Sequence, residues 1–129
     1  MFALLAAGDR WSEWAGPFVP RSRWAVTADP PGSVGAVRRL GVGVLGSSER
    51  ITEFVPDRRL AYEIDSWQPY KDYRSTVDLV PTTDGGTRIV WRSSFEPRVP
   101  GTGPALRVAL AALVGSFARN LARAAERAG

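Results

Sequence analysis

The chain of 129 residues contains no cysteine and no histidine, and Lys71 is its only lysine. Disulfide bonds, thiolate nucleophiles, imidazole bases and zinc sites built from cysteine or histidine are therefore excluded. Any chemistry must come from carboxylates, hydroxyl groups, arginines, Lys71 or backbone groups. We accordingly expect a protein that works without a metal or another cofactor.

Long apolar runs are also absent. No window approaches the roughly 18 consecutive apolar residues of a membrane span. The apolar opening at residues 1–7 carries no basic residue before it, and Asp9 and Arg10 end it early, so it is a poor signal peptide. The sequence predicts a cytoplasmic protein without a membrane span.

The charge of the chain is moderately positive, with a formal net charge of +4 and a pI of about 10.3. The arginines are spread along the sequence, whereas a nucleic-acid interface favours a clustered basic patch. We therefore expect a solvated surface and no nucleic-acid partner. Hydrophobic residues make up 44% of the chain, which at this length predicts one domain, 1–129, with its own core.

Six segments carry strand signals and are separated by short stretches of turn-forming residues. They are 22–28, 34–40, 48–55, 59–66, 72–80 and 86–96. Links this short join antiparallel neighbours, because a parallel pair needs a long crossover. In the third segment Ile51 and Phe54 can face one side only if the strand contains a bulge, so Glu53 could point inward or outward.

The last two predicted strands form a hairpin centred on Asp84, in which alternation pairs the inward-facing residues of both strands. The pairs are Leu79 with Ile89, Val77 with Trp91, Ser75 with Ser93, and Tyr73 with Phe95. Two small hydroxyl residues then oppose each other between larger neighbours. This arrangement predicts empty volume above Ser75 and Ser93, as in the floor of a cavity.

Two helices complete the predicted α+β fold. A short one covers residues 2–7, and a long one runs from Pro104 to about Arg127. At about 100° per residue, Leu113 and Phe117 belong to the apolar face of the long helix. The inward face of the sheet is the apolar surface on which this helix can pack.

With these elements, the sequence resembles the polyketide cyclase/dehydrase-like family of the START-related (SRPBCC) superfamily. The resemblance is carried by PGSVGAVRRL at 31–40, ERITEFVPDRRLAYEI at 49–64, and DYRSTVDLVPTTDGGTRIVWRSSF at 72–95. It implies a helix-grip fold, in which a curved seven-stranded antiparallel sheet wraps around a long C-terminal helix. The first family strand has no counterpart here, which implies six strands, an N-terminally truncated domain and an exposed sheet edge that would allow a homodimer.

The resemblance and the alternation together suggest residues that line a ligand cavity. They are Trp14, Tyr62, Trp67, Tyr73, Ser75, Trp91, Ser93, Phe95, Leu113 and Phe117. Trp14 and Trp67 would lie near the cavity mouth, where residues 67–70 are a candidate lid. Ordinary core packing is the alternative for each of these side chains.

Three functions remain open from the sequence. The first is binding of a small hydrophobic ligand, aromatic or polyketide/lipid-like, in the cavity. The second is a cyclase/dehydrase-type enzyme, for which Glu53 and Tyr73 are the candidate proton-transfer residues. The third is a protein-interaction module.

Overall fold

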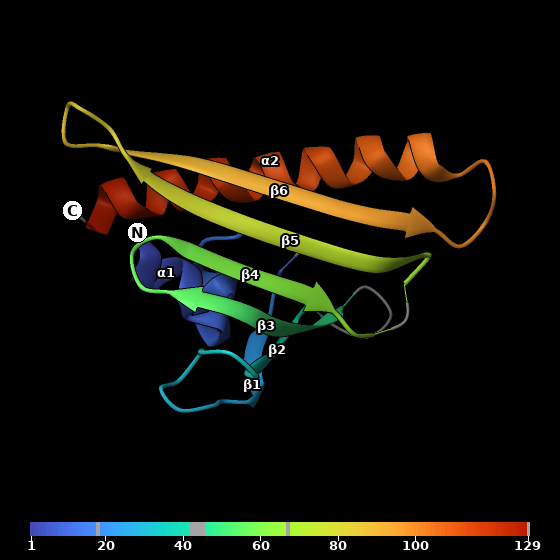
Figure 1. Cartoon of the computed structure of the whole chain (residues 1–129), viewed down its shortest axis with the longest axis horizontal. Helices are drawn as coiled ribbons and strands as arrows, with labels where there is room; N and C mark the ends of the chain where they lie inside the picture. The colour runs from blue at the N-terminus through green and yellow to red at the C-terminus, as the bar shows by residue number, and fades with distance from the viewer. Residues whose placement is uncertain (18, 42–45, 67, 129) are drawn as a thin grey trace.

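The computed structural model describes residues 1–17, 19–41, 46–66 and 68–128 (Figure 1). Two short helical segments precede a sheet of six strands, and a long helix follows it. The elements are α1 (Phe2–Ala6), η1 (Gly8–Glu13), β1 (Ser22–Val26), β2 (Val37–Leu40), β3 (Ser47–Val55), β4 (Arg59–Ile64), β5 (Tyr70–Pro81), β6 (Thr87–Pro97) and α2 (Gly103–Ala128).

Every neighbouring pair of strands in the sheet is antiparallel, and the strands follow chain order from β1 to β6. The predicted α+β class, the antiparallel sheet and the long C-terminal helix are confirmed. Two strand starts differ from the prediction by more than one residue. β2 begins at Val37 because Ser33 and Ala36 close a turn, and β5 begins at Tyr70, inside the predicted break.

A bulge in β3 resolves the orientation that the sequence left open. The register between β3 and β4 shifts between Ile51 and Glu53. This bulge places the side chains of Ile51 and Phe54 on the same face of the sheet, toward the core. Ile51 is buried, and the Phe54 ring packs edge-on against Phe2 at 5.3 Å. Glu53 consequently points away from the core.

The predicted hairpin register is right for three of its four pairs: Leu79–Ile89, Val77–Trp91 and Ser75–Ser93. The fourth pair, Tyr73 with Phe95, is wrong. The register shifts between Lys71 and Arg74, where Asp72 adopts a left-handed backbone conformation with φ of 53°. Because of this shift, the Tyr70 ring packs against Phe95, at 5.8 Å between centroids.

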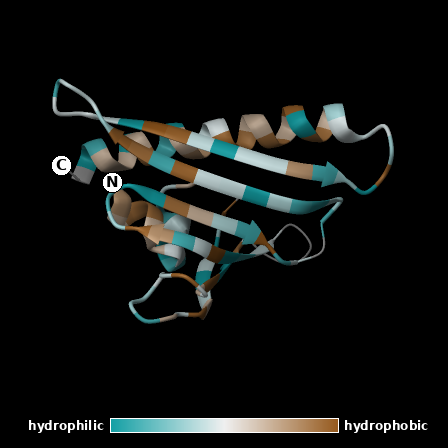
Figure 2. Ribbon diagram, viewed as in Figure 1, coloured by the Kyte–Doolittle hydropathy of each residue, from teal (hydrophilic) through white to brown (hydrophobic). Residues whose placement is uncertain are grey.

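Helix α2 runs along β6 (Figure 1). The residues of its second half that face the core, Phe117, Leu121 and Ala124, are buried. Its first half is more open, and Val108 is 72% exposed although brown, hydrophobic residues recur along the helix (Figure 2). By length and composition alone α2 could cross a membrane. In this fold the helix instead contributes to the core.

The indole of Trp11 occupies the centre of the core. It is fully buried and donates a hydrogen bond from Nε1 to the carbonyl oxygen of Leu5 at 2.8 Å. Its ring makes edge contacts with Trp91 of β6 and Phe117 of α2. One side chain of η1 thereby joins the sheet to the long helix and defines one end of the space between them.

Candidate functional site

A cavity of about 290 Å³ lies between the inner face of the sheet and the middle of α2. Strands β2 to β5, the loop after η1 and α2 all contribute to its wall. The lining residues are Pro17, Val19, Pro20, Leu40, Ser47, Glu49, Tyr62, Ile64, Gln68, Tyr70, Tyr73, Leu110, Leu113 and Phe117. A mostly apolar wall with a few polar groups is the usual composition of a small-molecule site.

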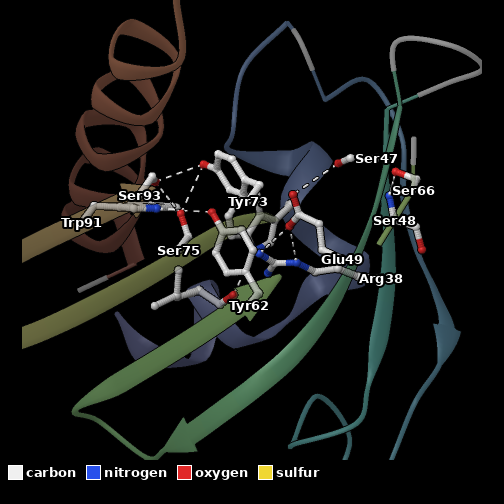
Figure 3. A network of polar contacts seen from close by, with 12 residues as sticks. Arg38, Ser47, Ser48, Glu49, Tyr62, Ser66, Tyr73, Ser75, Trp91 and Ser93 are labelled. Atoms are coloured by element: carbon white, nitrogen blue, oxygen red, sulfur yellow. Dashed lines mark hydrogen bonds and ion pairs between the residues drawn. The ribbon is translucent and has the colours of Figure 1, made fainter. Parts of the chain in front are cut away.

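Three hydroxyl groups form a closed cluster beside the cavity (Figure 3). Tyr73 donates to Ser93 Oγ at 3.0 Å and accepts from Ser75 Oγ at 3.2 Å. Ser75 and Ser93 also contact each other across the β5–β6 pair, at 2.5 Å between their oxygens. The Tyr73 phenol therefore covers Ser75, which is buried, whereas Ser93 is exposed.

The tyrosine hydroxyls of the cavity wall are neutral at physiological pH. Burial raises the pKa of Tyr62 well above its ordinary value and also raises the pKa of Tyr73. It raises the pKa of Tyr70 to about 12. The Tyr62 oxygen accepts a hydrogen bond from Trp91 Nε1 at 3.3 Å. These phenols can orient a ligand by hydrogen bonding, and none is poised to act as a phenolate base.

A buried ion pair stands at the β2–β3 side of the cavity. Arg38 Nε donates to Glu49 Oε1 at 3.0 Å, and Arg38 Nη2 lies 2.9 Å from the same oxygen. Ser47 Oγ donates to Glu49 Oε2 at 3.2 Å. Glu49 is one of the residues that line the cavity, and Arg38 is not. Figure 3 shows the guanidinium of Arg38 turned toward the Glu49 carboxylate.

The guanidinium of Arg38 is enclosed by aromatic rings. Its central carbon lies 4.0 Å from the ring centroid of Trp11 and 4.5 Å from that of Tyr62. Within the described residues, its nitrogens Nη1 and Nη2 have no hydrogen bond of good geometry, although Nη2 is at ion-pair distance from Glu49. The cation is therefore stabilised by the Glu49 charge and by the faces of two rings.

Sequence reasoning missed this ion pair. Arg38 lies two residues before Leu40, and both side chains are buried, so the alternation of β2 places them on one face. From the sequence alone, Val37 and Arg39 could equally well be the two residues that face the core, with Arg38 and Leu40 facing outward. Nothing in the four-residue strand distinguishes the two phases without knowledge of what packs on β2.

Four of the predicted ligand-binding residues line the cavity: Tyr62, Tyr73, Leu113 and Phe117. Three others, Trp91, Ser93 and Phe95, line a separate groove of about 390 Å³ between β6 and α2. These three residues are therefore not part of the wall of the 290 Å³ cavity, although Leu110 borders both spaces.

Two further expectations about the cavity need correction. Ser75 is buried beneath the Tyr73 hydroxyl, so no empty floor lies above it. Ser93 is exposed and lines the groove between β6 and α2, so empty volume lies above only one of the two serines. Trp14 lies in the core, where its ring is 4.7 Å from that of Trp11, and does not stand at a cavity mouth. Trp67 is outside the described residues, whereas Gln68 and Tyr70 of the candidate lid do line the cavity.

Glu53 lies on the outer surface of the sheet. Its carboxylate is half exposed and lies 3.6 Å from Arg59. The inward orientation considered for a proton-transfer role is not observed, because the β3 bulge turns this residue outward. In the part of the chain that the structure describes, no group of three or more acidic residues could hold a metal ion.

The fold and the cavity define a helix-grip protein, in which an antiparallel sheet and a C-terminal helix enclose a space. The family described as polyketide cyclase / dehydrase and lipid transport matches residues 1–126. The chain belongs to this family. No protein with a curated description matches the chain significantly.

Solved structures support the fold. A START superfamily protein from Mycobacterium smegmatis superposes with a TM-score of 0.79 at 12% identity, covering 98% of this chain and 88% of that protein. An uncharacterized protein from Bacillus thuringiensis has a TM-score of 0.73 at 23% identity, with 95% and 86% covered. A protein from Nitrosospira multiformis gives 0.67 at 19% identity, with 92% and 83% covered. At these identities the likeness concerns the fold alone.

Proposed function

We propose that this protein binds a small, largely apolar molecule in the cavity between the sheet and α2. The observation that carries the proposal is the composition of the wall, where aliphatic and aromatic side chains surround a few hydroxyls and one carboxylate. Apolar surface drives burial of the ligand, and the polar groups fix its orientation. An aromatic or lipid-like molecule fits this wall.

The size of the cavity limits the ligand. Its volume of about 290 Å³ corresponds to about ten water molecules at liquid density. A molecule of two fused rings or a short acyl chain would fill it, whereas a full-length lipid would need the cavity to open toward Gln68 and Tyr70. The family name, which includes lipid transport, is compatible with either size.

Two helix variants test the binding site. Leu113→Trp adds ring volume inside the cavity, and Val108→Trp makes a comparable addition on the exposed side of the same helix. Isothermal titration with naphthalene derivatives should show binding to the wild type and to Val108→Trp, and at least a tenfold loss in Leu113→Trp. Equal affinity in all three proteins would place the ligand elsewhere. Native mass spectrometry of the purified protein would reveal a retained natural ligand.

A second candidate function is cyclisation or dehydration of a polyketide-like substrate. It is favoured by one observation, that a carboxylate, Glu49, and a neutral phenol, Tyr73, face the same cavity. A carboxylate can accept a proton, and the Tyr73 hydroxyl, on turning from Ser93 to the substrate, can donate a hydrogen bond to a developing enolate. Turnover of a poly-β-ketone that is lost in Tyr73→Phe would support catalysis over simple binding.

Self-association through β6 is a separate proposal, which takes a second copy of the chain as the partner. In the described sheet β6 has β5 as its neighbour on one side and an open edge on the other. The apolar groove between β6 and α2 borders that edge. Antiparallel pairing of two β6 strands about Arg92 would set Ile89 opposite Phe95, and Arg88 opposite Glu96, of the second copy.

The cytoplasmic location also remains a prediction, which cell fractionation tests.

A further inference from the structure

The polar groups of the cavity differ in what they offer a ligand. The hydroxyl of Tyr73 donates to Ser93, and that of Ser47 donates to Glu49. The side-chain nitrogen of Gln68 donates to the Gly46 carbonyl at 3.1 Å. These three donors are directed at protein atoms. Tyr62 and Tyr70 also bring neutral hydroxyls to the wall, so the cavity offers a ligand phenol groups together with the acceptor lone pairs of Glu49.

Glu49 is the strongest of these acceptors. It is the charged residue among the described residues that line the cavity, and only 8% of its side chain is exposed. A carboxylate can accept about four hydrogen bonds. Arg38 engages Oε1, whereas Oε2 receives one hydrogen bond, from Ser47. Acceptor capacity is therefore left over at Oε2 of a residue that lines the cavity.

Arg38 holds this acceptor in a fixed position. Its side chain is fully buried and is clamped between the rings of Trp11 and Tyr62. A cation held in this way orients the carboxylate and offsets the cost of burying it. The pair presents a fixed negative oxygen to a space that is otherwise apolar.

We infer that Glu49, positioned by Arg38, determines the specificity of the cavity for ligands with a hydrogen-bond donor at one end, such as a phenol, an alcohol or an amine. The same oxygen disfavours carboxylate ligands, free fatty acids included, because two like charges would meet in an apolar space. This inference rests on the proposed function. It narrows the ligand to a neutral or cationic molecule with an apolar body.

Three probes of one shape separate these ligand classes. 2-Naphthol carries a donor, 2-methylnaphthalene replaces the hydroxyl by a methyl group of similar size, and 2-naphthoate carries a negative charge. Isothermal titration of the wild type should give at least tenfold tighter binding of 2-naphthol than of 2-methylnaphthalene, and the weakest binding for 2-naphthoate. Equal affinity for the first two probes would overturn the inference.

Substitution of Glu49 assigns the preference to this residue. Glu49→Gln should reduce the 2-naphthol preference by about tenfold and improve 2-naphthoate binding. Because this variant leaves the Arg38 charge without its partner, the double variant Arg38→Met/Glu49→Gln provides a second measurement without the buried charge. Glu63→Gln is the matched control, since Glu63 pairs with Arg50 on the outer face of the sheet.

The outcomes distinguish this inference from the proposed function. Binding of all three probes with the same preference in wild type and both Glu49 variants would overturn the role of Glu49 and leave the cavity as the binding site. Failure of every probe to bind the wild type would overturn both. Loss of the 2-naphthol preference in the Glu49 variants, with the Glu63→Gln control unchanged, is the expected result.

Discussion

Arg38 Nη2 lies 2.9 Å from Glu49 Oε1, and neither side chain has more than a small exposed fraction. Charges are seldom buried in a domain of this size unless they are paired. Here the pair joins β2 to β3 at the wall of the cavity. Its geometry affects the stability of the protein as well as the ligand it can accept.

Breaking this pair should be costly. Arg38→Ala leaves the Glu49 carboxylate buried without its cation, and we expect the free energy of unfolding to fall by about 3–5 kcal/mol. Urea unfolding followed by tryptophan fluorescence measures the loss. Arg50→Ala, which breaks the exposed pair with Glu63, should cost no more than about 1 kcal/mol. The double variant Arg38→Met/Glu49→Leu should be near wild-type stability, and a large loss there would contradict an electrostatic origin.

Gly8 is required by the close packing around Arg38. A Cβ atom at this position would lie 2.8 Å from Arg38 Cδ and 2.8 Å from Trp24 Cη2. We expect Gly8→Ala to destabilise the fold by about 1–3 kcal/mol, because rings and a clamped guanidinium cannot move aside. Gly103→Ala is the control, since its added Cβ would meet Pro97 at 3.5 Å, an ordinary contact. A thermal melt that ranks the two variants in the opposite order would refute this explanation.

The buried tyrosines should make stability decline at alkaline pH. Burial raises the pKa of Tyr62 and Tyr73 in the folded state, and that of Tyr70 to about 12, above the value of about 10 in an unfolded chain. Between these values the unfolded chain has lost protons that the folded chain retains, so the free energy of unfolding falls as the pH rises. The contribution is fully present below about pH 10 and is lost through about pH 12.

Urea unfolding at several pH values checks this prediction. The chain has no histidine or cysteine side chain to titrate between pH 6 and 9, so stability should be nearly constant there. Tyr62→Phe should make the alkaline decline shallower. A steep change near pH 7, or an unchanged slope in Tyr62→Phe, would exclude the buried tyrosines as the cause.

Arg92 is expected to limit self-association at the β6 edge. Two β6 strands paired about this position would place two Arg92 side chains opposite each other, and like charges in direct cross-strand contact are unfavourable. Arg92→Thr should therefore tighten a dimer several-fold. Sedimentation velocity measures this effect, with Arg123→Thr on the exposed side of α2 as the control. A monomer at every concentration, in all three proteins, would rule out the dimer.

Most of the fold could be predicted from the sequence because it depends on short-range patterns. Alternation and turn-forming residues locate the strands to within a few residues, and a register counted from the Asp84 turn is right from Leu79 to Ser75. The predicted register fails at Asp72, where a bulge shifts the pairing of the residues farther from the turn, Lys71 and Tyr70. A bulge depends on the packing of Tyr70 and Phe95, which lie far apart in the chain.

The candidate site was harder to predict for a related reason. Tyr62, Tyr73, Leu113 and Phe117 follow from periodicity, since each belongs to the apolar face of a regular element. Glu53 and Glu49 are both glutamates of β3, and the sequence alone does not say which one faces inward. The bulge beside Glu53 makes that choice.

The sequence by itself determined the secondary structure, the antiparallel order and the chemistry that is available, because these depend on residue types and on local spacing. Only the tertiary structure decided where the open space lies. The Tyr73 phenol covers Ser75 and leaves Ser93 open to the groove beside α2, and Arg38 pairs with Glu49 in an otherwise apolar wall. The position of open space in the core depends on how large and charged side chains from distant segments pack together. The alternation of residues along one strand contains no information about that packing.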